Sequence, residues 1–342
     1  MKTLEMLKYP LIQGGMGVGI SMGGLAGAVA REGGMGVIST ANIGFREDDF
    51  WTNPREANKR ALVKEIQKAR EISEGNGMIA INAMVATSDY DEAVKTACEA
   101  GIDAVISGAG LPVNLPALTE GYDCLIAPVV SGKKAAKVLA RLWKKHNDRA
   151  FDFVVVEGNG AGGHLGFSEE DVLSEDPKSI FDIATEVKEE VGEIPVFCAG
   201  SVFDRQDFEK AKNVGAFGVQ IGTRFIATHE CDACDGFKEV ILEAKSEDLA
   251  VFKSPVGMPA RGIKTPLIEN VLEGNYKKPE KCIRCIKTCD LANTPYCITR
   301  ALIDAYYGKK ETGLFFAGSN VEKVNEITGV SHIFEELFGQ EE

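Results

Sequence analysis

Short apolar, β-rich runs alternate with longer helical stretches along most of this chain, and that alternation limits the fold more than any other feature. The predicted strands are Leu11–Met16, Gly36–Ser39, Met78–Val85, Ala104–Ser107, Cys124–Val130, Phe153–Glu157, Pro195–Ala199 and Gly218–Ile221. The predicted helices are Ser21–Glu32, Asn58–Ser73, Tyr90–Ala100, Val113–Thr119, Lys133–His146, Ile180–Val191, Asp204–Asn213 and Asp235–Lys245. Because the strand runs are continuously apolar, both faces of the sheet should be buried. Either helices cover both faces, or helices cover the outside of a closed barrel whose interior is packed with side chains.

The number of strand–helix units predicts an α/β protein of the (β/α)₈ TIM-barrel class, for which about 250 residues is typical. A doubly wound sheet is the alternative, but it needs fewer strands and usually a second domain at this length. From about Leu249 the alternation stops, and a Pro- and Gly-rich stretch, a cysteine cluster and two helical segments follow. We therefore predict a barrel over residues 1–248 and a C-terminal helical, cysteine-containing cap over residues 249–342.

Amino-acid composition and net charge limit the class of protein and the kinds of partner that it can bind. Hydrophobic residues make up 44% and charged residues 26%, which excludes a disordered chain. A net charge of −13 argues against nucleic acid and anionic membranes, since both attract basic surfaces. No apolar run reaches the roughly 18–20 residues of a membrane span, and the N-terminus MKTLEMLKYPLIQGG lacks a signal-peptide pattern, so a cytoplasmic location is expected.

Glycine, at 37 residues, is enriched and falls at the ends of the predicted strands. QGGMGVG follows the first, SGAG the fourth, EGNGAGGHLG the sixth, AGS the seventh and GTRF the eighth, while Asn82 lies at the end of the third. Any one of these glycines could simply form a tight turn. Glycines at so many strand ends indicate instead that the backbone approaches a ligand, because the carboxyl ends of barrel strands carry the site.

The last two strand ends point to a phosphate. Gly200-Ser201 and Gly222-Thr223 stand where barrels commonly bind phosphate through backbone N–H groups and a helix N-terminus. Thr223 adds a hydroxyl donor, and Arg224 could supply charge. A phosphate-bearing cofactor or substrate is the direct inference.

His164 is the candidate catalytic residue. It directly follows Gly158-x-Gly160-x-x-Gly163, which formally matches a dinucleotide-binding fingerprint. We reject that interpretation because the motif must open directly into a helix, and here a polar segment and Pro177 intervene. Imidazole is well suited to proton transfer near neutral pH. The alternative is a loop histidine that only caps a turn.

These segments together resemble the nitronate monooxygenase family, a group of FMN-dependent barrels that includes the flavin-dependent enoyl-ACP reductases of type II fatty-acid synthesis. The motifs are PLIQGGMGVGIS with LAGAVAREGGMGVIS, AGGHLG, and VFCAGSVFD with GVQIGTRF, in this order within residues 10–226. The resemblance implies an FMN phosphate held by Gly200, Ser201, Gln220, Ile221, Gly222 and Thr223. It implies that the flavin ring lies near Gly14, Gly15, Met16, Asn82 and Gly162, and Gly163 is also assigned to the cofactor site. His164 matches the family histidine beside the flavin.

Two positions depart from the family pattern. Glu157, which we also assign to the cofactor site, stands where many nitronate monooxygenases have glutamine, and an anionic glutamate only accepts hydrogen bonds. Ser201 replaces the commoner glycine in AGS, and its hydroxyl could still face phosphate.

The resemblance allows two reactions. The first is oxidation of alkyl nitronates by O₂, with His164 in proton transfer. The second is reduction of an enoyl thioester by NAD(P)H, with acyl-carrier protein as a partner that could dock on the basic helix Lys133–His146. A non-flavin barrel and a non-catalytic phosphate-binding barrel are the alternatives of other classes. A homodimer is a further expectation, and the physiological substrate and the choice between NADH and NADPH stay open.

The cysteines of the tail depart most from the family pattern. Cys282, Cys285, Cys289 and Cys297 fall within 16 residues, a density that is typical of an Fe–S or zinc site. Their spacing matches neither a standard zinc ribbon nor the bacterial ferredoxin run. Iron–sulfur, zinc and no metal at all therefore remain open.

Overall fold

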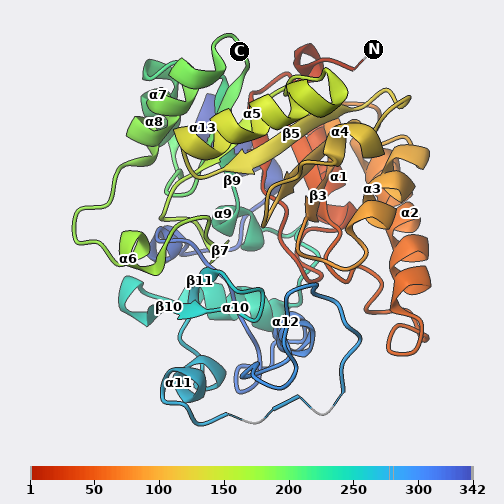
Figure 1. Cartoon of the computed structure of the whole chain (residues 1–342). Coiled ribbons are helices and arrows are strands. Elements are labelled where there is room, and N and C mark those ends of the chain that lie inside the picture. Colours follow the sequence, from red (N-terminus) through yellow and green to blue (C-terminus); the bar gives the residue numbers. More distant parts are fainter. Residues whose placement is uncertain (1, 277, 280, 340–342) are drawn as a thin grey trace.

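A computed structural model describes residues 2–276, 278–279 and 281–339, and it confirms the predicted barrel. Eight parallel strands close in the order β1-β2-β3-β4-β5-β6-β8-β9, with Ile12 of β1 facing Met35 on one side and Gln220 on the other (Figure 1). The strands of the molecule are β1 Leu11–Gln13, β2 Met35–Ser39, β3 Met78–Met84, β4 Ala104–Gly108, β5 Leu125–Val130, β6 Val154–Glu157, β7 Gly163–His164, β8 Val196–Ala199, β9 Gly218–Ile221, β10 Leu249–Lys253 and β11 Pro259–Ile263.

Helices surround the barrel and continue into the tail. They are α1 Gly23–Arg31, α2 Pro54–Ser73, α3 Tyr90–Glu99, α4 Leu115–Leu118, α5 Lys133–Asn147, α6 Glu169–Val172, α7 Ile180–Val191, α8 Arg205–Asn213, α9 Thr223–Ile226, α10 Asp235–Glu243, α11 Pro266–Leu272, α12 Ile298–Tyr306 and α13 Val330–Phe338. The Asp204 side chain caps α8 by accepting the Asp207 N–H at 3.0 Å.

Side chains fill the barrel interior, so it is a core and not a pore. Alternate positions of the strands face inward, and the rings of Phe153 and Phe197 meet edge-on with centroids 5.5 Å apart. The other inward-facing residues include Ile12, Met35, Val37, Met78, Ala80, Ile106, Ala127 and Val155. The intervening strand positions pack against the helices, which explains why the strand runs are continuously apolar.

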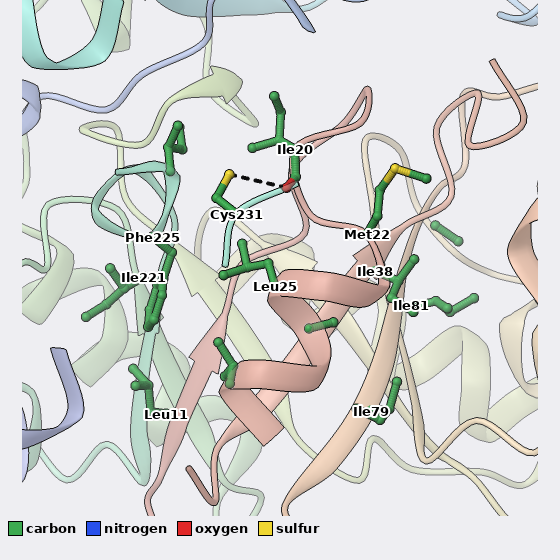
Figure 2. Packing of buried hydrophobic residues seen from close by; sticks show 14 of the residues in the cluster. Leu11, Ile20, Met22, Leu25, Ile38, Ile79, Ile81, Ile221, Phe225 and Cys231 are labelled. Atoms are coloured by element: carbon green, nitrogen blue, oxygen red, sulfur yellow. Dashed lines mark hydrogen bonds between the residues drawn. The ribbon is translucent and has the colours of Figure 1, made fainter. Parts of the chain in front are cut away.

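Helix α1 shows how the outer layer is packed. In the view of Figure 2, Leu25 of α1 lies between Ile221 of β9 and Ile38 of β2. The Cys231 thiol donates to the carbonyl of Ile20 at 3.5 Å, so this cysteine is a buried filler that also ties the β9 side to the loop before α1. One helix thus covers several strands, as a barrel layer requires.

Helix α5 differs from its predicted orientation. The amphipathic pattern of Lys133–His146 predicts that Val138 and Leu142 lie on the buried side, opposite a basic outer face. In the structure the buried residues are Ala136, Leu139 and Trp143, and Val138 is 40% exposed. The aromatic ring decides the rotation, because the Trp143 indole N–H reaches the Pro112 carbonyl at 2.9 Å in the core.

The tail contains more structure than the two helical segments expected. Strands β10 and β11 form an antiparallel hairpin, and β11 also pairs with β7, so that Ala260 faces His164. Three helices, α11, α12 and α13, follow. The sequence did not predict a hairpin in the Pro- and Gly-rich stretch. Strand β11 is only five residues long, and the turn before it, which includes Gly257, interrupts the pattern of buried and less buried residues.

The helix predicted at Asp235–Lys245 is confirmed as α10, but α13 takes the place of the eighth helix around the barrel. It returns from the tail to pack against α8 and α1 (Figure 1). Phe338 stacks on Tyr9 with centroids 4.5 Å apart and meets Phe208 at 5.1 Å. Tail residues such as Phe334 and Leu337 therefore belong to the same apolar cluster as the barrel. The division at residue 248 stays a prediction.

Among the described residues, the structure has no helix that is both long and apolar enough to span a membrane.

Candidate active site

A cavity opens at the carboxyl ends of the barrel strands, between them and the tail. The residues predicted from the sequence for the site all line it: Gly14, Gly15, Met16, Asn82, Glu157, Gly162, Gly163, His164, Gly200, Ser201, Gln220, Ile221, Gly222 and Thr223. They come from five barrel strands or the loops that follow them. The topology therefore brings together at one end of the barrel what the sequence separates by up to about 200 residues.

One end of the cavity is rich in neutral hydrogen-bonding groups. The hydroxyls of Ser201 and Ser319 lie 3.3 Å apart. Thr223 Oγ1 accepts the Gly318 N–H at 2.9 Å, which leaves the hydroxyl proton for another acceptor. Helix α9 is only four residues long, so local backbone and hydroxyl donors, rather than a long helix dipole, characterise this end.

Ser201, which replaces the second glycine of the commoner AGG, has an unfavourable backbone conformation. Its φ is +67°, in the left-handed region that glycine adopts freely and other residues rarely do. Gly160 packs directly against it, because a Cβ at Gly160 would lie 1.9 Å from Ser201 Oγ. A strained residue held by close neighbours in this way is common at ligand sites.

Arg224 does not give this end a free charge. Its guanidinium forms an ion pair with Glu336 of α13 and donates to the Phe203 carbonyl at 2.7 Å. Burial is the main cause that lowers its pKa. The arginine therefore ties α13 to the barrel, and an anion at this end would depend on the neutral donors.

Glycine also forms the part of the cavity wall that follows β1. A Cβ at Gly15 would lie 2.3 Å from Asn82 Cβ, so only glycine fits there. The N–H groups of Gly14 and Met16 already donate to the Ile221 carbonyl at 2.8 Å and to Ser21 Oγ at 2.8 Å. These two amides are thus used within the protein, and the segment presents backbone surface to the cavity rather than free donors.

His164 is held by the tail on two sides. Its Nε2 lies 2.7 Å from Ser254 Oγ, and the Phe316 ring meets the imidazole edge-on at a centroid distance of 5.3 Å. The pairing of β7 with β11 fixes its backbone. Burial lowers the pKa of His164 to about 4, so the imidazole is neutral near pH 7 and one ring nitrogen can accept a proton.

Glu157 corrects the expectation of an anionic carboxylate. It ends β6 at the cavity wall, and burial raises its pKa to about 7. Near neutral pH a large share of the carboxyl groups is therefore protonated and can donate a hydrogen bond, as the glutamine amide of many family members can.

Sequence reasoning missed the part of the site that the tail supplies. Ser254 and Phe316 contact His164, and Leu302, Leu314, Phe316, Gly318, Ser319 and Asn320 line the cavity. The Arg261 guanidinium donates to the carbonyls of Asn159 and Ala161, which holds the glycine-rich loop before His164 in place. The Gly-Ser-Asn run at 318–320 was the available signal, since it resembles the other strand ends.

The tail cysteines are separate from this cavity. All nine cysteines of the chain are free thiols. Across residues 2–276, 278–279 and 281–339, no three His, Cys, Asp or Glu side chains stand close enough together to hold a metal ion.

Known proteins resemble this chain along most of its length. A probable nitronate monooxygenase of Staphylococcus saprophyticus is 26% identical over 301 residues, 80% of this chain and 81% of the relative. A protein of Mycobacterium tuberculosis named (3aS,4S,5R,7aS)-5-hydroxy-7a-methyl-1-oxo-octahydro-1H-indene-4-carboxyl-CoA dehydrogenase is 25% identical over 269 residues, 79% of this chain and 67% of the relative.

Solved structures also resemble this chain along most of its length. FabK from Thermotoga maritima superimposes with a TM-score of 0.76 at 26% identity, covering 98% of this chain and 92% of that one. A nitroalkane oxidase from Streptomyces ansochromogenes shares the fold with a TM-score of 0.76 at 18% identity, over 97% and 95% of the two chains.

A sequence model of the nitronate monooxygenase family matches residues 1–340. This match spans nearly the whole chain, including the tail that builds one wall of the cavity. The family also implies a flavin as the cofactor. The chain therefore belongs to the nitronate monooxygenase family and is an oxidoreductase.

Proposed function

We propose that this enzyme binds FMN in the cavity and oxidises alkyl nitronates with O₂. The observation that carries the proposal is a half-buried, neutral His164, fixed by Ser254, on the wall of a cavity that also has a glycine-lined surface and neutral hydrogen-bond donors. Family membership and the staphylococcal relatives support the same reaction class.

The residues present fit FMN. A Cβ at Gly162 would lie 2.5 Å from the backbone of Ala317, and one at Gly160 would clash with Ser201. The segments of the cavity wall therefore pack closely at positions where only glycine fits. Ser201, Gly222 and Thr223 would hold the phosphate, and Gly14, Gly15, Asn82 and Gly162 would lie along the ring. When bound, FMN supplies the electron transfer of the reaction, while the protein positions the substrate and handles protons.

His164 would handle the proton. With its pKa lowered to about 4, the imidazole is in its neutral form throughout the neutral range and keeps one unprotonated ring nitrogen, although burial makes it a weaker base than a free histidine; Ser254 fixes the ring. Phe316 and Leu314 add apolar surface to the cavity wall. A small anionic substrate would also be repelled less by a protonated Glu157 than by a carboxylate.

His164→Ala tests this proposal. We expect turnover of an alkyl nitronate to fall about 100-fold or more, because positioned acid–base groups contribute this much. Bound flavin should keep its absorption spectrum, which shows that the cavity is intact. His332→Ala on the exposed face of α13 is the matched control and should behave as the wild type. Unchanged turnover in His164→Ala, or protein that never binds FMN, contradicts the proposal.

A second candidate reaction is the NAD(P)H-dependent reduction of an enoyl thioester. Among the relatives is a dehydrogenase named for a carboxyl-CoA thioester, and Glu157 replaces the glutamine of many nitronate monooxygenases. Acyl-carrier protein is the proposed partner in that case. Part of the basic face of α5 is already neutralised, since Lys133 pairs with Glu189 and Lys137 with Glu190.

Anaerobic mixing separates the two reactions. If the enzyme is a nitronate oxidase, a nitronate should bleach the flavin absorbance within the turnover time, whereas NAD(P)H should not. If NAD(P)H alone bleaches the flavin and an enoyl thioester restores the colour, the second candidate is correct and the first is wrong.

A further inference from the structure

Two cysteine side chains from different elements meet at the end of the barrel where the strands begin. Cys98 lies in the last turn of α3, which leads into β4, and Cys124 directly precedes β5. Their Sγ atoms are 3.8 Å apart, so the two thiols are in contact and share a hydrogen bond. The cavity lies at the carboxyl ends of the strands, so this pair is a feature separate from the active site.

The distance between the two sulfurs is short enough for a covalent bond to form with little movement. A disulfide holds its sulfur atoms about 2.05 Å apart. From the 3.8 Å of the structure, each sulfur has to move by about 0.9 Å, which a small rotation of the two side chains can supply. In the described part of the chain, these are the only two thiols that hydrogen-bond to each other.

Both thiols are buried, but each lies one residue away from solvent. Cys124 is 9% exposed and follows the exposed residues 121–123, and Cys98 is 5% exposed and precedes the exposed Glu99. Cys198 in β8, by contrast, is fully buried. A small oxidant such as hydrogen peroxide therefore reaches the pair more easily than it reaches the cysteine of the barrel core.

The two thiols are not equivalent in acidity. A hydrogen bond from the Cys98 thiol lowers the pKa of Cys124, and the charge of Arg149 lowers it further, against the opposing effect of burial. The same hydrogen bond, together with burial, raises the pKa of Cys98. Burial raises the pKa of Cys198 and of Cys231 to about 12. Because the thiolate is the form that reacts with oxidants, Cys124 is the attacking thiol and Cys98 the one that completes the bond.

We propose that Cys98 and Cys124 form a reversible disulfide on exposure to hydrogen peroxide, and that this bond stabilises the barrel. The Cys124 thiolate attacks one peroxide oxygen, the O–O bond breaks, and a sulfenic acid and a hydroxide ion form. The hydroxide takes up the proton that Cys124 released and becomes water. The Cys98 sulfur then attacks the sulfenic sulfur, the S–S bond forms, and the hydroxyl group leaves as a second water with the proton of Cys98. Two thiols are thus oxidised while one peroxide is reduced to two waters, and a dithiol reductant reverses the bond.

The position of the pair determines what such a bond would do. It would link α3 to β5 and enclose residues 99–123, which include β4 and α4. A cross-link of this kind restricts the unfolded chain, so the folded state gains stability relative to it. Gly108 at the carboxyl end of β4 lines the cavity, whereas the sulfurs lie near the start of that strand. Cofactor binding should therefore not change when the bond forms.

Peptide mapping of the wild-type holoenzyme tests the proposal. Hydrogen peroxide is added until the exposed Cys282 is oxidised, the remaining thiols are alkylated in denaturant, and the protein is digested without reductant. We expect a peptide that joins Cys98 to Cys124, lighter than the two separate peptides by the two hydrogens lost, and its disappearance after treatment with dithiothreitol. Alkylated Cys98 and Cys124 in protein whose Cys282 is oxidised would overturn the proposal.

Substitution of each cysteine tests the order of attack. In Cys98→Ser the sulfenic acid at Cys124 has no thiol to react with, so its adduct with dimedone should increase about 10-fold over the wild type. Cys124→Ser should give no such adduct at Cys98. Cys234→Ser, a half-buried cysteine outside the pair, is the control and should still form the cross-link. Equal adducts in the two variants would refute the assigned roles.

Thermal unfolding of the same samples tests the effect on stability. The oxidised wild type should melt about 5 °C above the reduced protein, and dithiothreitol should remove the difference. Peroxide should not raise the melting temperature of Cys98→Ser, because the bond cannot form there. A cross-linked wild type that melts no higher than the reduced protein would refute the stabilising role. These measurements do not depend on the proposed function, and FMN affinity measured in parallel should be the same in both redox states.

Discussion

The barrel and the tail contribute different kinds of groups to the same cavity. From the barrel come mainly backbone surfaces and small side chains, such as Gly14, Gly15, Gly222 and Thr223. From the tail come the side chains that fix His164, which are Ser254 and Phe316. The difference suggests that the barrel binds the cofactor, while the tail sets the geometry of the proton-handling residue. Substitutions in the two regions should therefore affect binding and turnover separately.

The largest effect is expected at the barrel side. Gly222→Ala has an ordinary φ of −112°, and its new Cβ would meet only Met16 Sδ, at 3.6 Å, so the protein should fold. The added methyl group would project toward the cavity and crowd the proposed phosphate position. We expect FMN affinity, measured by fluorescence titration, to fall about 100-fold.

The control for this prediction is Gly132→Ala, where a Cβ meets open space outside the cavity. That variant should bind FMN as the wild type does. Equal FMN affinity in Gly222→Ala would mean that the cofactor does not approach this strand end.

The next largest effect concerns Glu157, which lies on the cavity wall at the end of β6. The pKa of Glu157 is raised from 4.5 to about 7 in the folded protein, so the folded state holds more protons between these values. The free energy of unfolding of FMN-free protein should therefore fall by about 2 kcal/mol from this group as pH rises from 4.5 to 7. Glu157→Gln should lack that fall.

Urea unfolding of both proteins at pH 5 and pH 7.5 measures this difference. His164, whose pKa is lowered, acts in the opposite direction between about pH 4 and 6.5, but it does so in both proteins and cancels. A stability difference between wild type and Glu157→Gln that is the same at both pH values would show that the carboxyl is not perturbed.

A smaller effect is expected on the tail side. Ser254→Ala removes the hydroxyl that lies 2.7 Å from His164 Nε2. We expect kcat to fall about 10-fold, with FMN affinity unchanged, because positioning rather than binding is lost. Ser254→Thr keeps a hydroxyl and should restore most of the rate, and Ser331→Ala on α13 is the control. Weaker FMN binding with normal kcat would refute the division of roles.

The smallest effect is expected at Ser201. Ser201→Gly relieves a left-handed conformation that costs a non-glycine residue about 1 kcal/mol, and it removes the contact with Ser319. We expect the melting temperature of the FMN-free protein to change by no more than a few degrees. A large loss of stability would show that the serine pair joins barrel and tail more strongly than the backbone does.

Much of the fold followed from local patterns. Continuous apolar strands can be recognised within a few residues and were confirmed, and the sequence also predicts Asp204 as the cap of the helix that it begins, which the structure confirms. The orientation of α5 was predicted wrongly, because Val138 and Trp143 compete for the buried face and only the partner at Pro112 decides between them. The helix expected after β9 is present as α10, but α13 occupies the eighth position around the barrel; it lies about 110 residues after β9, and no local signal connects them.

By itself, the sequence determined the strand ends, because glycine and small polar residues mark them directly and the barrel topology gathers them at one face. It also singled out His164, which is the one histidine in a glycine-rich loop. Only the tertiary structure decided what surrounds that histidine. Ser254 and Phe316 lie 90 and 152 residues further along the chain, so their contact with His164 depends on the β7–β11 pairing and on packing. The protonation of Glu157 was likewise decided by burial, a property of the folded cavity that no residue carries alone.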